Sequence, residues 1–195
     1  MKRFGFLLSL LAVSLLGGNV FAQGDNSVYF TTYYSNANTH GAPDGVLRII
    51  NDGSYTGSPY RNLWAAIYVF DDQEELQDCC ACGVTPDGLL SESVNKNLTA
   101  NAFRGVLPTR GVIKVVSIPG DDPTNIFPTP GLRVWATHVQ ATSNEPEKGP
   151  FFMTESLAAD SNLTAEEQSA LENACAYNAT LSGLPCTCTS EGYDY

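Results

Sequence analysis

The chain has 195 residues, of which 10 are basic and 21 are acidic, for a formal net charge of −11 at pH 7. A surface of this sign repels nucleic acid and anionic lipid, so the composition argues against both as partners. Aromatic and β-branched residues are plentiful, and Gly and Pro are spread along the chain, which is typical of an all-β domain.

The first 22 residues have the three parts of a secretory signal peptide. Lys2 and Arg3 form a positive start, Phe4–Leu16 is almost wholly apolar, and Ala22 ends a small-residue cleavage site before Gln23. The apolar run is shorter than the roughly 20 residues that cross a bilayer, so an uncleaved anchor is the weaker alternative. We expect a secreted, periplasmic or cell-surface protein with no membrane span in the mature chain.

Removal of the signal leaves residues 23–195, with 8 basic and 21 acidic side chains and a formal charge of −13. We expect one domain, because this length is ordinary for a single hydrophobic core and no segment reads as a linker. We interpret the acidity as a source of solubility outside the cell. A cation-binding surface is the alternative.

The first half of the mature chain contains three predicted strands. Val28–Tyr34 is rich in Tyr and Thr and is expected at a sheet edge, and Val46–Ile50 follows a Pro-Asp-Gly turn. Leu63–Phe70 is apolar enough to be buried on both faces. The acidic segment Asp71–Asp78 is interpreted as one helical turn.

Two more strands and one ambiguous segment follow. Leu89–Leu98 fits a strand or a loop equally well, whereas Val112–Ile118 is predicted to be a strand. Leu132–Gln140 alternates apolar and polar residues, which predicts that Leu132, Val134, Ala136 and His138 share one face.

One helix is predicted near the C-terminus. Thr164 and Glu167 have capping-box spacing, in which the Thr hydroxyl accepts from the Glu167 backbone and the Glu167 carboxylate reaches back. We expect a core-facing stripe and an end near Ala176. The stripe consists of Ala170, Leu171, Ala174 and Cys175. Together these elements predict a single-domain, mainly β sandwich with one C-terminal α-helix that disulfides hold in place.

Six cysteines form two clusters, and an even number in an exported chain predicts disulfides. The clusters are Cys79, Cys80, Cys82 and Cys175, Cys186, Cys188. We favour bridges between the clusters. In an extended chain, Cys79 and Cys80 would point to opposite sides. Alternatives are a strained bond between these two neighbours, a zinc or copper(I) thiolate site, and a redox pair formed by Cys79 and Cys82.

We predict no catalytic residue, and we expect no cofactor or metal site. His40 lies in a polar loop, and His138 fits a structural role in a strand. No Gly-x-Ser-x-Gly motif is present. Two acidic groups offer calcium-type oxygen ligands without EF-hand spacing, and we interpret both as solvated turns. They are Asp71 with Asp72 and Asp78, and Asp121 with Asp122 and Asn125.

One pattern resembles a known group of proteins. Ile67–Asp71, Leu76–Cys82, Val84–Leu89 and the late Cys186–Cys188 together resemble exported bacterial proteins of unknown function. The resemblance implies a bacterial envelope or extracellular setting. It implies no activity and no catalytic residue.

We expect a non-enzymatic structural or binding module whose partner is another copy of the chain or an extracellular polymer. In one version, Gln23–Tyr34 pairs with the sheet edge of a neighbour and builds a surface fibre or matrix. A carbohydrate-binding module, with Tyr55, Tyr60 or Trp135 exposed on one flat face, is one alternative. An extracellular hydrolase is another.

Overall fold

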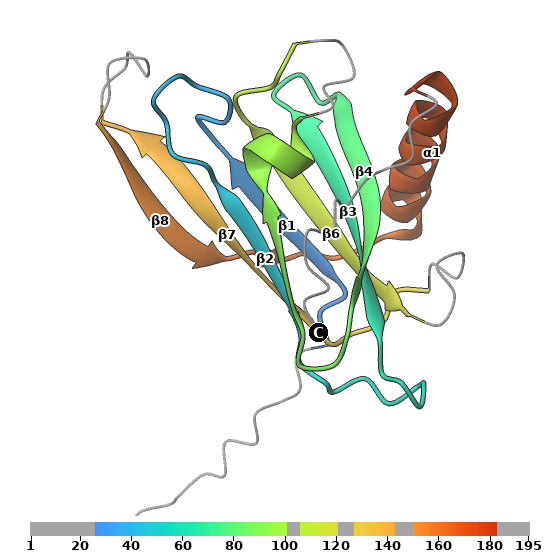
Figure 1. Ribbon diagram of the computed structural model, residues 1–195. Coiled ribbons are helices and arrows are strands. Elements are labelled where there is room, and N and C mark those ends of the chain that lie inside the picture. The colour runs from blue at the N-terminus through green and yellow to red at the C-terminus, as the bar shows by residue number, and fades with distance from the viewer. Residues whose placement is uncertain (1–25, 101–105, 121–126, 143–149, 183–195) are drawn as a thin grey trace, which may run out of the picture.

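The structure is a computed structural model that describes residues 26–100, 106–120, 127–142 and 150–182. Two antiparallel sheets face each other, and one helix lies outside them (Figure 1). The strand orders are β4-β3-β6-β1-β9 and β5-β2-β7-β8. The elements are β1 (Tyr29–Tyr34), β2 (Val46–Asn51), β3 (Leu63–Asp71), β4 (Leu76–Val84), β5 (Leu89–Ser93), the π-helical turn η1 (Val94–Leu98), β6 (Gly111–Pro119), β7 (Leu132–Ala141), β8 (Phe151–Leu157), β9 (Ala159–Asp160) and α1 (Ala165–Ser182). The predicted sandwich with a C-terminal helix is confirmed.

The main hydrophobic core lies between the two sheets, where alternate residues of each strand meet. In β3, Leu63, Ala65, Ile67 and Val69 are fully buried and belong to this inner core. β7 contributes every second residue, as its alternation predicts. Its inner-core residues are Leu132, Val134 and Ala136.

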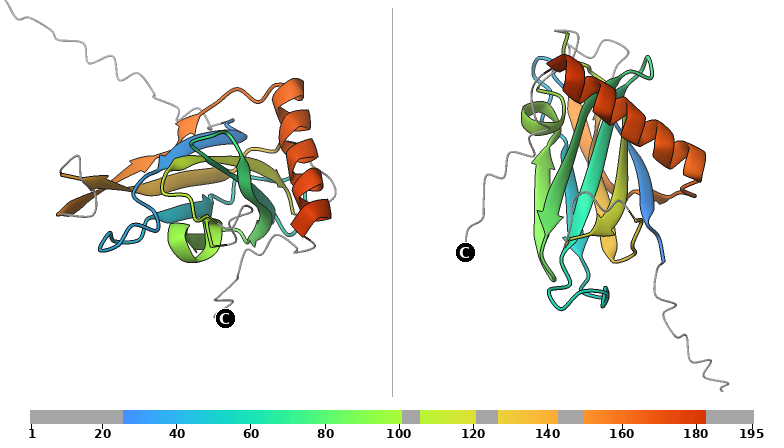
Figure 2. Two further views of the ribbon diagram at one scale, coloured as in Figure 1. Left: turned by 90° about the horizontal axis from the view of Figure 1, so that it is seen from above. Right: turned by 90° about the vertical axis from the view of Figure 1, so that its right-hand side faces the viewer.

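The outer face of the five-stranded sheet is covered by α1, which crosses the strands in Figure 2. Leu171 is buried there against a second cluster that includes Tyr68 of β3 and Ile118 of β6. Because β3 has the core on one face and this cluster on the other, the prediction that it is buried on both faces is confirmed. Ala174 and Cys175 pack against the same cluster, whereas Ala170 is exposed and does not belong to the predicted stripe.

One of the two hydrogen bonds of the predicted capping box is present in the first turn of α1. The Glu167 backbone N–H donates to Thr164 Oγ1 at 3.1 Å. The Glu167 carboxylate turns toward the sheet instead, where Oε1 accepts from Tyr29 Oη and Lys114 Nζ, each at 2.6 Å. The helix also continues past Ala176 to Ser182, because no helix-breaking residue comes before Gly183.

Three other expectations are corrected or resolved. Asp71–Asp78 is not helical: a turn joins β3 to β4, and Asp71 Oδ1 accepts from the backbone N–H groups of Gln73 and Glu75. Leu89–Leu98 divides into β5 and η1. β1 lies one place in from the edge of its sheet, since β9 pairs with two of its residues.

Candidate functional site

The two sheets have four outer strands, and three of these offer little surface for a partner. β9 is two residues long. β5 is five residues long and runs directly into η1. β4 packs against α1 and is bonded to it through Cys79 and Cys175. The fourth outer strand, β8, is seven residues long and lies on the side of the molecule away from α1 (Figure 1).

β8 is exposed along nearly its whole length. Phe151 is partly buried and the six residues after it are exposed. Phe152, Met153 and Leu157 are 50%, 49% and 63% exposed, so apolar side chains project from both faces of the strand. A long edge strand with exposed apolar residues is a site for pairing with another chain.

The backbone of β8 presents free hydrogen-bonding groups to solvent. Ala158 N–H donates to Val134 O on β7 at 2.9 Å. Because successive peptide groups of a strand point in opposite directions, the even-numbered residues face β7 and the odd-numbered ones face outward. The outward set is Phe151, Met153, Glu155 and Leu157. A partner strand can therefore bind here without breaking the β7–β8 ladder.

Features that normally protect an edge strand are absent from β8 within Phe151–Leu157. The segment contains no proline and no lysine, and its register with β7 is continuous. Its one charged residue, Glu155, is paired with Arg48 at 2.8 Å on the outer face of the sheet. The charge that would repel an approaching acidic chain is thus partly neutralised.

His138 lies beside this edge and is 3% exposed. Its Nδ1 is 3.0 Å from Tyr33 O, and its Nε2 is 2.8 Å from Ser156 Oγ on β8. A carbonyl can only accept, so Nδ1 carries the proton and Nε2 accepts from the serine hydroxyl. The Tyr33 ring stacks on the imidazole with centroids 3.9 Å apart. The hydrogen bond from His138 to Tyr33 O also satisfies a backbone carbonyl of β1 beyond the two residues that pair with β9.

The chemistry of this pair is that of a nucleophile and a base. Burial lowers the pKa of His138, against the opposing effect of the Tyr33 carbonyl, so the ring is neutral at pH 7. A neutral imidazole bonded to an exposed serine is the arrangement found in serine hydrolases. One component is missing at Ser156: its own N–H points into the β7 ladder and cannot bind an oxyanion.

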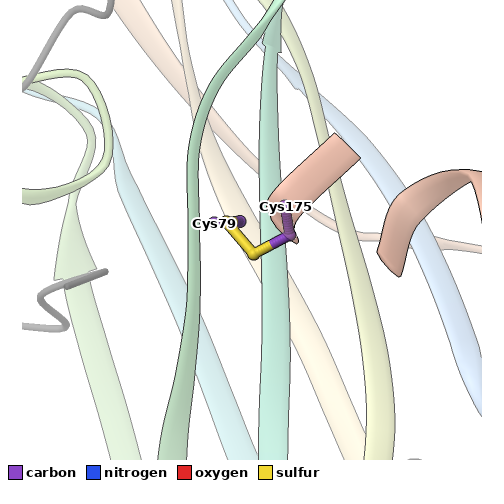
Figure 3. The surroundings of a disulfide bond; sticks show 2 residues. All are labelled: Cys79 and Cys175. Atoms are coloured by element: carbon purple, nitrogen blue, oxygen red, sulfur yellow. A yellow bond between two sulfur atoms is a disulfide. The ribbon is translucent and has the colours of Figure 1, made fainter. Parts of the chain in front are cut away.

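The cysteines follow the predicted geometry in part. Cys79 and Cys175 form a disulfide with Cα atoms 5.8 Å apart, which joins β4 to α1 (Figure 3). This bond links the two clusters and excludes a bond between Cys79 and Cys80. Cys79 faces the helix, whereas Cys80 and Cys82 face the inner core, as expected for an extended chain. Cys82 is also disulfide-bonded, and Cys186 and Cys188 lie outside the described residues.

Of the two acidic groups that we interpret as solvated turns, the structure describes the first and not the second. Asp71 organises the β3–β4 turn, and Asp72 bonds Arg110 at 2.7 Å. Asp78 lies in β4, while Asp121, Asp122 and Asn125 lie outside the described residues. Across the described residues, no three His, Cys, Asp or Glu side chains are grouped to hold a metal ion.

The aromatic residues named for carbohydrate binding occupy three different environments. Tyr55 packs against the inner core, Tyr60 is 72% exposed in the loop before β3, and Trp135 is partly buried on β7. His40 is exposed, as expected for its loop.

The predicted cleavage position, Ala22 and Gln23, lies outside the described residues. In the part of the chain that the structure describes, no helix has the length and apolar character needed to cross a membrane. The β8 edge was missed by sequence reasoning because none of its side chains is deeply buried, so no inside–outside alternation marks it. The run Phe151-Phe152-Met153 beside Pro150 was the available signal.

No family model, curated protein or solved structure matches this chain. The resemblance to exported bacterial proteins therefore stays a prediction.

Proposed function

We propose that this chain is an exported, non-catalytic structural or binding module that engages its partner by β-strand addition at β8. The exposed, unprotected β8 edge is the observation that carries the proposal. Strand addition gains affinity from backbone hydrogen bonds and specificity from alternate side chains, and β8 offers both. A surface fibre or matrix is the setting in which such an edge has a use.

Export rests on the N-terminal signal pattern and fits the Cys79–Cys175 disulfide, since such bonds persist in oxidising compartments. The sequence alone suggests Gln23–Tyr34 as the docking strand. β1 pairs with β6 along all six of its residues, and Tyr29 and Tyr34 are buried. The proposal therefore assigns docking to β8 and leaves β1 in its own sheet.

The test compares the native protein with Met153→Pro. The Met153 N–H points outward, so proline removes an edge donor and blocks pairing while sparing the ladder with β7. Ser91→Pro is the matched control, because Ser91 is exposed and its backbone N–H points away from β2, toward the open side of β5. Material isolated from the native host should be found in a complex that Met153→Pro abolishes and Ser91→Pro preserves. A complex that survives Met153→Pro would remove the proposal.

The second candidate is a serine hydrolase, favoured by the 2.8 Å contact between Ser156 Oγ and His138 Nε2. A fluorophosphonate probe reports directly on an activated serine. If the chain is a hydrolase, the wild type is labelled and Ser156→Ala is not. The binding-module proposal expects no labelling of either, because Ser156 lacks its own backbone oxyanion donor.

A further inference from the structure

We propose that the partner on β8 is a second copy of this chain, paired antiparallel about a two-fold axis at Thr154. This inference rests on the proposed function, because it uses the same edge. It adds the identity of the partner, the register and the symmetry of the contact.

The backbone allows one full-length two-fold register. Odd-numbered residues carry the outward N–H and C=O groups, so odd residues of one copy must face odd residues of the other. Pairing Phe151 with Leu157 of the second copy satisfies this rule and overlaps the whole strand. Met153 then faces Glu155 of the second copy, and Thr154 faces its own counterpart. Every outward backbone group of β8 finds a partner.

The side chains of this register are compatible. Phe151 and Leu157 form an apolar pair at each end, and Phe152 lies beside Ser156 of the second copy. Met153 is uncharged and faces Glu155 of the second copy, so no two carboxylates lie directly opposite each other. The two Glu155 side chains are diagonal neighbours on the outer face, and each is paired with Arg48 of its own chain. Pairs of this kind each stabilise an antiparallel sheet by roughly 0.2–1 kcal/mol.

Electrostatics usually oppose self-association in a chain with 21 acidic and 10 basic side chains. β8 is suited to overcome this, because its single acid is paired with Arg48 in the same chain. A second Arg48–Glu155 pair lies on the other copy. The two copies can therefore approach along β8 without placing unpaired carboxylates face to face.

The result of such pairing is one continuous eight-stranded sheet made from the two four-stranded sheets. A two-fold contact uses the same surface on both copies and closes on itself, so it makes a dimer. A fibre or matrix built from this dimer needs a second contact elsewhere. The dimer is thus the building unit of the proposed assembly.

Sedimentation equilibrium of the purified chain tests the partner. The wild type should pass from monomer to dimer as concentration rises, and Ser91→Pro should behave in the same way. Met153→Pro removes an edge donor from both copies and should raise the dissociation constant about tenfold or more. A wild type that stays monomeric at all concentrations would overturn the inference.

Cysteine cross-linking tests the register. Thr154 and its counterpart form a directly facing, non-hydrogen-bonded pair, whose Cβ atoms come close enough for a disulfide. Thr154→Cys should form a covalent dimer on oxidation, whereas Phe152→Cys should not, since Phe152 faces Ser156 of the second copy. The wild type controls for the native cysteines. Cross-linking of Phe152→Cys in preference to Thr154→Cys would overturn the two-fold at Thr154.

The two proposals fail in different ways. A monomeric purified chain, together with a native complex that Met153→Pro abolishes, removes the second-copy inference and leaves strand addition at β8 in place. A native complex that Met153→Pro does not affect removes strand addition at β8 itself. Circular dichroism and thermal unfolding of each variant establish that the fold is retained.

Discussion

Lys114 on β6 and Glu167 in the first turn of α1 are joined by an ion pair 2.6 Å long, which fixes the helix to the outer face of the sheet. Tyr29 donates to the same Glu167 oxygen at 2.6 Å. The Lys114 ammonium, with help from the Tyr29 hydroxyl, holds the pKa of Glu167 below its usual range. The start of the helix is thereby attached through polar groups, and Cys175 attaches it further along through a covalent bond.

Glu167→Gln should destabilise the fold by about 1–2 kcal/mol at pH 7, because the charge-assisted bond to Lys114 is lost. Because the pKa of Glu167 is lower in the folded state, its ionised carboxylate stabilises the fold at pH values above the unfolded pKa of 4.5. This contribution disappears as the pH falls through the folded-state pKa. The difference between wild type and variant should therefore shrink in acid. Urea unfolding at pH 7 and pH 3 measures it. Glu166→Gln, at an exposed neighbour, should have a much smaller effect, and equal effects would contradict the account.

The double variant Cys79→Ala/Cys175→Ala should be less stable than the wild type. The bond joins residues 96 positions apart, and a loop of that size is worth about 4–5 kcal/mol in the chain-entropy model, with measured values commonly about 2–5 kcal/mol. Chemical denaturation under non-reducing conditions gives the difference. A double variant as stable as the wild type would contradict a stabilising role of the disulfide and would leave packing and the Glu167 contacts as the attachment of α1.

Glu92→Gln should change how the stability of the fold depends on pH around neutrality. Burial, and then the charge of Asp78, raise the pKa of Glu92 to about 7, and its Oε2 has no hydrogen-bond partner among the described residues. A raised folded pKa means that stability is greatest below the unfolded value of 4.5 and is lost as pH rises through about 7.

Between pH 5 and pH 8 the wild type should therefore lose stability relative to Glu92→Gln by up to about 3 kcal/mol. Ser91→Ala, at the exposed neighbour, serves as the control and should keep the wild-type slope. Parallel pH profiles for wild type and Glu92→Gln would mean that Glu92 titrates normally.

His138→Asn should change the pH dependence of stability in the opposite direction to Glu92→Gln. The asparagine Nδ2 can still donate to Tyr33 O, but the bond to Ser156 and the stacked ring are lost, at about 1–3 kcal/mol. The His138 pKa is lowered by burial, so its contribution is present above 6.5 and is lost as pH falls through the folded pKa. Wild type and variant should converge between pH 8 and pH 5. A constant difference would contradict a buried neutral imidazole.

The sequence predicts a strand correctly where buried and exposed side chains alternate along it. In Leu132–Gln140 each inward residue is apolar up to His138, and β7 occupies that segment. The opposed side chains of Cys79 and Cys80 follow from extended geometry alone, but this geometry does not choose which of the two cysteines faces α1. Thr164 marks the start of α1 because its hydroxyl satisfies a backbone donor that the helix itself cannot.

The rest depends on tertiary contacts that local patterns do not contain. Asp78 and Gly83 are poor strand residues, yet they lie in β4 because β3 supplies the hydrogen bonds. β8 is held in place by its pairing with β7, and its own side chains are mostly exposed. Its sequence therefore lacks the alternation of buried and exposed residues that marks a core strand. The contact between His138 and Ser156 joins residues on two strands whose register the sequence does not give.

Hydrogen–deuterium exchange of the native material, measured on the peptide that covers Phe151–Leu157, tests the central claim most directly. If β8 is the docking edge, this peptide should exchange more slowly in the isolated assembly than in the dilute, dissociated chain, while the β5 peptide that covers Leu89–Ser93 should exchange equally in both. Equal exchange of the β8 peptide in the two states would contradict the claim that a partner strand occupies this edge.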